Sequence, residues 1–310
     1  MESTTPHKRH RWLIWAVGSV LAAASVVSLW LFVLIPISFR TVRREVQGCS
    51  QAASRVGRMP TIEMDAAIGR LGGPGKALPE LVRYIRAPSW VGRHRDMAVL
   101  MLGRCGRPAV PALTELANRA SDGLESSSII ALAEMGPEAI DALPLFEDLL
   151  QNESSEKRSV AAAAIGKMGP PAKHAAPLLL ELLDRSTGLE RFMVVTATDE
   201  VGENGESVVP SVARAYGDSD ARIRLECVRI LGRVSPPNAT VIEVLIRALN
   251  DEDASARRAS ASALARLGPA AAAAIPALEK ASHAQDEVLS EWARNALESI
   301  RRENPGSNGK

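Results

Sequence analysis

The chain has 310 residues, 46% of them hydrophobic and 24% charged, so it can bury a sizeable core and is not disordered throughout. Its 37 lysines and arginines nearly balance 36 aspartates and glutamates, and a net charge of +1 disfavours a protein whose affinity depends on nucleic-acid phosphates. Aromatic residues make up only 4% of the chain, which leaves aliphatic side chains as the main apolar mass.

The N-terminal region is a short basic tail, residues 1–11, followed by an apolar segment. Trp12 to Phe39 contains no charged side chain, and as a helix it would be about 42 Å long, more than the ~30 Å hydrocarbon core of a bilayer. Aromatic residues stand near both of its ends, which is typical of membrane interfaces. We expect one uncleaved transmembrane helix over residues 12–39, with a cleaved signal peptide or a buried core helix as the alternatives.

The flanks of this segment leave its orientation open, because three basic residues lie close to each end: Lys8, Arg9 and Arg11 before it, and Arg40, Arg43 and Arg44 after it. The expected location is a membrane, a bacterial inner membrane in the simplest case, with the side of the following domain undetermined. Residues 40–60 are expected to form a helical juxtamembrane segment.

Residues 61–301 carry a repeat of 33 residues. Each unit has a glycine mark, with Ser235 in the one missing place: Gly72, Gly103, Gly136, Gly169, Gly202 and Gly268. A small residue stands five positions before the mark, with Ile230 as the exception: Ala67, Ala98, Ala131, Ala164, Ala197 and Ala263. A second mark follows the first by seven or eight positions: Pro79, Pro111, Pro144, Pro177, Pro210, Glu243 and Pro276.

Each column of the repeat has a physical reason. A glycine after a helical apolar run supplies the left-handed residue that ends a helix, and a proline directly after it prevents continuation. The apolar spacing within each half predicts two amphipathic helices per unit, and the small column allows helix axes to approach to ~8 Å. No single pair buries its apolar face alone, so the units must stack. The register predicts a capping helix over Leu289–Arg301, and residues 302–310 form a polar tail.

The repeats include ALARLGPAAAAAIPALEKA and ALAEMGPEAIDALPLFEDLL, which resemble HEAT repeats of the short Ala-Leu-Gly type found in phycobilisome-lyase-like proteins. The resemblance covers about residues 61–301 and implies an all-α solenoid of about seven helix pairs plus a C-terminal capping helix. It does not specify function, since such proteins serve as scaffolds, adaptors, chromophore lyases and occasionally enzymes. Thr198, Ser235 and Glu243 depart from the pattern.

The resemblance also implies an arginine on the first helix that faces an aspartate or asparagine of an inter-repeat turn. Arg158, Arg191, Arg224 and Arg257 recur at 33 residues, and the turns just upstream contain Asn152, Asp184, Asp218 and Asp251. We interpret them as a ladder of charge-assisted bonds that ties turns to neighbouring helices. A basic stripe for nucleic acid or lipid headgroups is the alternative.

The chemistry-bearing residues do not form a recognisable catalytic, cofactor or metal site. The three cysteines are far apart without a CxxC pair and are expected to be buried filler: Cys49, Cys105 and Cys227. The five histidines are scattered without a His-Glu pair of the kind that deoxyhypusine hydroxylase, an iron-binding HEAT enzyme, uses in its repeats. The glycines of Gly69–Ala77 do not have the spacing that a phosphate-binding loop requires. We therefore expect no catalysis, no cofactor and no metal.

One surface pattern remains. Four positions after each second mark, the residues expected to be exposed on the second helices are Arg83, Glu115, Asp148, Glu181, Arg214, Arg247 and Lys280. Three acidic units thus precede three basic ones along the face that the resemblance places on the concave side of the solenoid. An ordinary solvated face would also explain these charges. The functional hypothesis is a docking groove for a partner of complementary charge, another copy included.

These observations predict a membrane-anchored scaffold or adaptor for protein–protein interaction. They predict no nucleic-acid partner and no small-molecule substrate. The alternatives are a lyase or other enzyme that uses the groove as a small-molecule pocket, and a nucleic-acid-binding solenoid.

Overall fold

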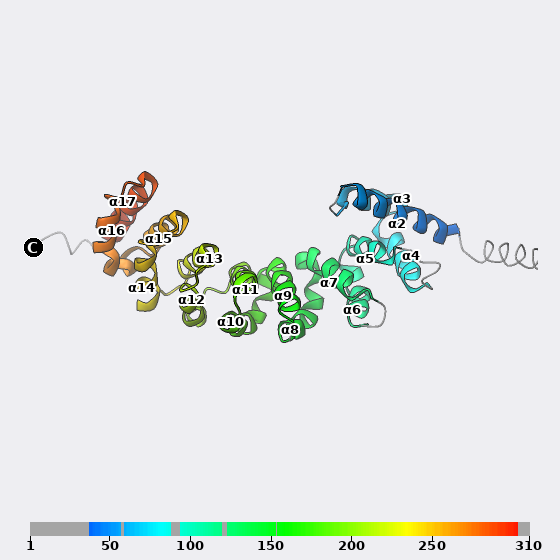
Figure 1. Ribbon diagram of the computed structural model, residues 1–310, viewed down its shortest axis with the longest axis horizontal. Coiled ribbons are helices and arrows are strands. Elements are labelled where there is room, and N and C mark those ends of the chain that lie inside the picture. Colours follow the sequence, from blue (N-terminus) through cyan, green and yellow to red (C-terminus); the bar gives the residue numbers. More distant parts are fainter. Residues whose placement is uncertain (1–36, 57–58, 88–93, 120–122, 153, 303–310) are drawn as a thin grey trace, which may run out of the picture. The chain divides into compact units, whose positions relative to one another are not determined.

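The computed structural model describes residues 37–56, 59–119 without 88–93, 123–152 and 154–302 (Figure 1). All secondary structure of these residues is helical, from α2 (Ile37–Val56) to α17 (Glu287–Arg302). Most of the predicted transmembrane segment, residues 12–36, lies outside the described part of the chain. The described residues form two compact units, which meet in the sequence between Cys105 and Gly106.

The first unit consists of α2, α3 (Thr61–Arg70), α4 (Pro74–Arg86) and α5 (Arg95–Gly103). Helix α2 packs against the other three through one apolar stripe, whose buried members are Phe39, Val42, Val46 and Cys49. The ring centroids of Phe39 and Tyr84 of α4 are 5.0 Å apart. Residues 40–56 therefore cover the first repeat.

This packing changes the expected end of the apolar segment. Phe39 was predicted to lie in the membrane segment, yet its side chain is buried within the first unit. The reason is that the buried stripe of α2 begins inside the uncharged run. The expected membrane segment and the apolar residues that pack in the first unit therefore follow each other without a charged residue between them.

The second unit alternates first and second helices along the chain (Figure 1). The first helices are α7 (Glu125–Glu134), α9 (Ser155–Met168), α11 (Gly188–Glu200), α13 (Ala221–Leu231) and α15 (Ala254–Leu267). The second helices are α6 (Val110–Ala117), α8 (Leu143–Leu150), α10 (Ala176–Arg185), α12 (Val209–Ala215), α14 (Ala239–Ala248) and α16 (Ile275–Ala281). Helix α17 packs on α15 and α16 at the end, as the register predicted for a cap.

Five of the glycine marks have the left-handed backbone that ends a helix: Gly72, Gly136, Gly169, Gly202 and Gly268. Gly103 was predicted to do the same but is the last residue of α5. Gly106, with a φ of 77°, adopts the left-handed conformation three residues later.

The second mark lies in the first turn of its helix in most units. Short 3₁₀ helices precede α6, α8, α10, α12 and α16: η1 (Arg107–Ala109), η3 (Gly136–Ala142), η4 (Pro170–Ala175), η5 (Glu206–Val208) and η6 (Gly268–Ala274). Each of these second helices has its proline within the first two positions, where no backbone N–H is missed. Pro79, by contrast, lies inside α4, and the peptide bond between Ser235 and Pro236 is cis.

The core follows the predicted columns. Every apolar residue two positions after the second mark is fully buried: Leu81, Leu113, Phe146, Leu179, Val212, Leu245 and Leu278. The small column is buried as well, and α7, α9, α11, α13, α15 and α17 pack in one row. Two glycines tighten this row: Gly166 in α9 and Gly232 directly after α13. A Cβ on Gly166 would come within 3.0 Å of the Ala197 Cα, and one on Gly232 within 2.5 Å of the Ala263 Cβ.

Among the described residues, the run Ala254–Ala281 is long and apolar enough to cross a membrane by length and composition. It comprises α15, η6 and α16, and its backbone bends at Ala271. Helix α15 packs against α13 and α17. The alanine-rich composition of this run is that of a tightly packed repeat, so it adds no membrane segment to the one predicted from sequence.

Candidate interaction surface

Six of the seven predicted surface residues lie on successive second helices of the second unit: Glu115, Asp148, Glu181, Arg214, Arg247 and Lys280. We call these six the charge row. Helices α8, α10, α12 and α14 pack side by side, so equivalent positions on them are neighbours. Glu115 is half-buried and the other five are exposed. Arg83 is also exposed, but it lies on α4 in the first unit and is not part of the row.

Two acids of the charge row pair with an arginine on their own helix. Glu115 Oε1 lies 2.7 Å from Arg119 Nη2, and Glu181 Oε1 lies 4.0 Å from Arg185 Nη1, each one turn further along. Such exposed pairs contribute little to stability and rearrange at small cost. These two carboxylates can therefore exchange their partners for groups on another molecule.

Two arginines of the charge row are oriented by a residue at the C-terminal end of the preceding second helix. Arg214 donates two hydrogen bonds to Asp184, at 3.1 Å and 2.6 Å, and this contact lowers the pKa of the Asp184 carboxyl. The Arg247 guanidinium lies over the ring of Tyr216, 5.2 Å from its centroid. These contacts restrict the two guanidiniums while leaving them at the surface.

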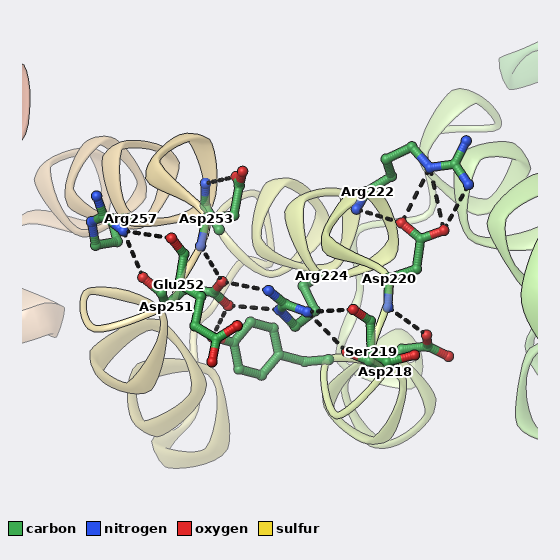
Figure 2. A network of polar contacts seen from close by, with 11 residues as sticks. Asp218, Ser219, Asp220, Arg222, Arg224, Asp251, Glu252, Asp253 and Arg257 are labelled. Carbon is green, nitrogen blue, oxygen red and sulfur yellow. Dashed lines mark hydrogen bonds and ion pairs between the residues drawn. The ribbon is translucent and has the colours of Figure 1, made fainter.

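The turns between repeats are held by the predicted arginine ladder, and Figure 2 shows its part around Arg224 and Arg257. Arg224 donates to both carboxylate oxygens of Asp251 in the next turn, at 2.9 Å and 2.8 Å. It also donates to the carbonyl oxygens of Asp218 and Ser219 in its own turn. One guanidinium thus joins two successive turns.

Asp251 is the most heavily bonded carboxylate of this network. Besides the two bonds from Arg224, it accepts one from the Tyr216 hydroxyl at 2.8 Å and one from the Asp253 amide at 2.9 Å. Its side chain is only 3% exposed. These bonds, led by those from Arg224, lower its pKa to about 2. Asp253 in turn caps the first turn of α15 through the Ala256 amide.

The other three arginines of the ladder also contact an acidic side chain, and the acid differs from one to the next. Arg191 donates to Asp218 at 2.8 Å, and Arg158 donates to Glu190 at 2.5 Å and 3.2 Å. Arg257 donates to two carbonyl oxygens of its own turn and lies 3.9 Å from Asp286. The prediction of a ladder is confirmed.

The ladder differs from the prediction in one respect. The acid comes from the following turn or helix, while the residue just upstream supplies its backbone carbonyl, as Asn152 does for Arg158. In three turns the Asn or Asp side chain instead accepts from the amide two residues on, which belongs to the next N-cap: Ser154, Asp220 and Asp253. The spacing of these pairs is a capping signal that sequence reasoning missed.

The three cysteines are buried and free, as predicted. Burial raises the pKa of all three thiols, that of Cys105 to about 11, so none is an activated nucleophile. Among the described residues, no group of three or more His, Cys, Asp or Glu side chains could hold a metal ion.

A family model of HEAT repeats matches residues 206–298. None of the curated proteins matches the chain in sequence. Several solved structures share its fold. The archaeal HEAT-like repeats protein from Thermococcus onnurineus NA1 is 13% identical, with a TM-score of 0.52 over 72% of this chain and 97% of that one. The YibA protein of Escherichia coli is 17% identical, with a TM-score of 0.56 over 78% and 86%.

An engineered protein is 20% identical, with a TM-score of 0.56 over 76% of this chain and 71% of that one. At these identities the similarity describes the fold alone. The family match and the shared fold agree with the observed alternation of helices and the buried columns. The described part of the chain is an all-helical repeat solenoid, and residues 206–298 within it match the model of HEAT repeats.

Proposed function

We propose that this protein is a membrane-anchored scaffold that binds a protein partner through the charge row. The observation that carries the proposal is the row itself, in which three acidic and three basic side chains stand at equivalent positions of six successive second helices. Charges segregated in this way along a rigid surface set the register of a partner and speed its association.

The position of the row supports this reading. Helices α8, α10, α12 and α14 contact each other and the first helices, and the turns between repeats are held by the arginine ladder. The row is therefore presented in one geometry, and the loss of side-chain entropy on binding is limited to surface groups.

The proposal is tested by affinity capture with the full-length protein in detergent. Changing Glu115, Asp148 and Glu181 together to lysine should abolish capture of partners that the wild-type protein retains at moderate salt, because the acidic half then repels a basic partner segment. The matched control changes three exposed acids outside the row to lysine: Glu156, Glu252 and Glu291. Equal capture by wild type and the row variant would refute a role for the row.

The membrane anchor is the second part of the proposal. Its support is the uncharged run that begins at Trp12 and reaches the start of α2 at Ile37, which as a helix would be long enough to span a bilayer. The full-length protein should stay in the membrane pellet after alkaline carbonate extraction, whereas a chain that lacks residues 1–36 should be released. Release of the full-length chain would contradict the anchor. Protease treatment of sealed vesicles then assigns the side that carries the solenoid.

We further propose that the protein acts by binding and not by catalysis. The buried thiols with raised pKa values and the dispersed histidines support this view. A lyase or other enzyme remains the competing function from another class. A tightly bound cofactor that absorbs visible light in the purified protein, or turnover that survives purification, would decide for it.

A further inference from the structure

Charges at equal distances from the middle of the row are opposite in sign. Between α10 and α12 the sign changes from Glu181 to Arg214, and each step outward repeats the opposition: Asp148 with Arg247, then Glu115 with Lys280. The row is therefore complementary to itself when it is reversed end to end. We propose that the partner of the charge row is a second copy of this chain, bound antiparallel about a two-fold axis. This inference rests on the proposed function of the row as a binding surface.

The geometry of such a contact follows from the repeat. A two-fold axis that lies in the interface and crosses the row between α10 and α12 brings every acid of one copy opposite a base of the other. Because the axis relates the two copies, the six pairs are three different pairs that each occur twice. A two-fold axis along the row would instead place each charge against itself, so the charges select the antiparallel arrangement.

The neighbouring column of the same face agrees with this arrangement. One position before the charge row stand Leu180 on α10, Ala213 on α12 and Ile246 on α14, all half-buried. Leu180 and Ala213 flank the axis beside Glu181 and Arg214, so apolar side chains face each other next to the innermost charge pairs of the contact.

Three further acids share the face and do not meet like charges in this arrangement. Glu147 would lie opposite Ile246, and its Oε1 is 3.4 Å from His174 Nε2 in the same molecule. Glu279 would lie opposite Thr114 and pairs with Arg301 at 2.7 Å. Glu243, which replaces the proline mark, would lie opposite Pro144. No acid of one copy faces an acid of the other at an equivalent position.

The experiment uses the full-length chain in detergent and measures the molar mass of the protein component by light scattering on a sizing column. Variant A is Glu115→Lys with Asp148→Lys, and variant B is Arg247→Glu with Lys280→Glu. Each variant alone places like charges opposite each other, so its dimer should dissociate about tenfold or more readily than the wild-type dimer. In a mixture of A with B every cross pair is again opposite in sign, and a heterodimer should form with wild-type affinity.

The wild-type dimer should also weaken as salt rises from low concentration to about 0.5 M, because exposed charges are screened. Circular dichroism of A and B confirms that both variants are folded. Association through the apolar segment alone would leave A, B and the wild type equally dimeric, and that result overturns the proposal. So does a mixture of A and B that stays monomeric.

The outcomes separate this inference from the proposed function. If A is monomeric and loses captured partners, while the A and B mixture gives no heterodimer, the row binds another protein and self-association is refuted. If the heterodimer forms but capture does not depend on the row, self-association stands and the row is not the docking surface for other proteins.

Discussion

At the residue scale, two kinds of Arg–Asp pair occur in the second unit, and their surroundings separate them. Arg224 and Asp251 are 15% and 3% exposed and share their bonds with a tyrosine and several backbone groups. Arg107 and Asp141 pair with similar geometry, but their side chains are 64% and 53% exposed. Water competes for the second pair and is excluded from the first, so only the first should matter for stability.

Replacing Asp251 with asparagine should lower the free energy of unfolding by about 2–4 kcal/mol, because Arg224 and Tyr216 lose a buried charged acceptor. Asp141→Asn is the matched control and should leave stability within experimental error. Chemical unfolding of the full-length protein in detergent, followed by circular dichroism, measures both. Equal effects of the two substitutions would show that burial does not govern these pairs.

The pH dependence of unfolding gives the same prediction an independent measure. The pKa of Asp251 is about 2 in the folded protein, below its ordinary value of 3.8. Its contribution is therefore complete above about pH 4 and is lost as the pH falls from about 4 towards 2. Asp251→Asn should lose less stability than the wild type over this interval. An identical acid dependence of the two proteins would contradict the assigned pKa.

At the scale of the helix, the distance between two packed helices depends on whether a residue at their contact carries a hydrogen atom or a methyl group on its Cα. In the middle of an exposed helix, alanine is favoured over glycine by about 1 kcal/mol, yet α9 keeps Gly166 in its last turns. The reason is α11, whose Ala197 Cα would lie 3.0 Å from an added Cβ. Glycine here lowers the helix propensity of α9, and in return the axes of α9 and α11 can lie closer together.

Gly166→Ala should therefore destabilise the protein by about 1–3 kcal/mol, because α9 and α11 must separate. Gly48→Ala in α2 is the control, since a Cβ there meets nothing within 4 Å, and it should stabilise by about 0.5–1 kcal/mol. Thermal unfolding of the two variants beside the wild type measures the difference. Stabilisation by Gly166→Ala would show that the two helices can move apart without loss.

At the scale of the whole molecule, the repeat explains what sequence reasoning could reach. The helix pairs, the capping helix and the buried columns follow from a period that acts on every unit alike. Features in which a single unit departs from the period could not be predicted, because the period describes only what all units share. The shift of the left-handed turn from Gly103 to Gly106 and the identity of the acids in the ladder depend on contacts with the next repeat.

The candidate surface was predictable only as a pattern of charge. Its positions follow from the register, but the pairing of Arg214 with Asp184 and the stacking of Arg247 on Tyr216 require the turn geometry. The role of α2 was hidden by composition, because Phe39 continues an apolar run that began at Trp12. A hydropathy pattern records how apolar a side chain is, and not whether lipid or protein covers it.

The burial of Phe39 also has a mechanical consequence. Helix α2 starts at Ile37, and Phe39 is already packed in the first folded unit. A long flexible tether would let a domain diffuse freely around its anchor point. Here Phe39 follows Pro36 by three residues, so even a fully extended chain would hold the first unit within about 10 Å of the end of the proposed membrane segment.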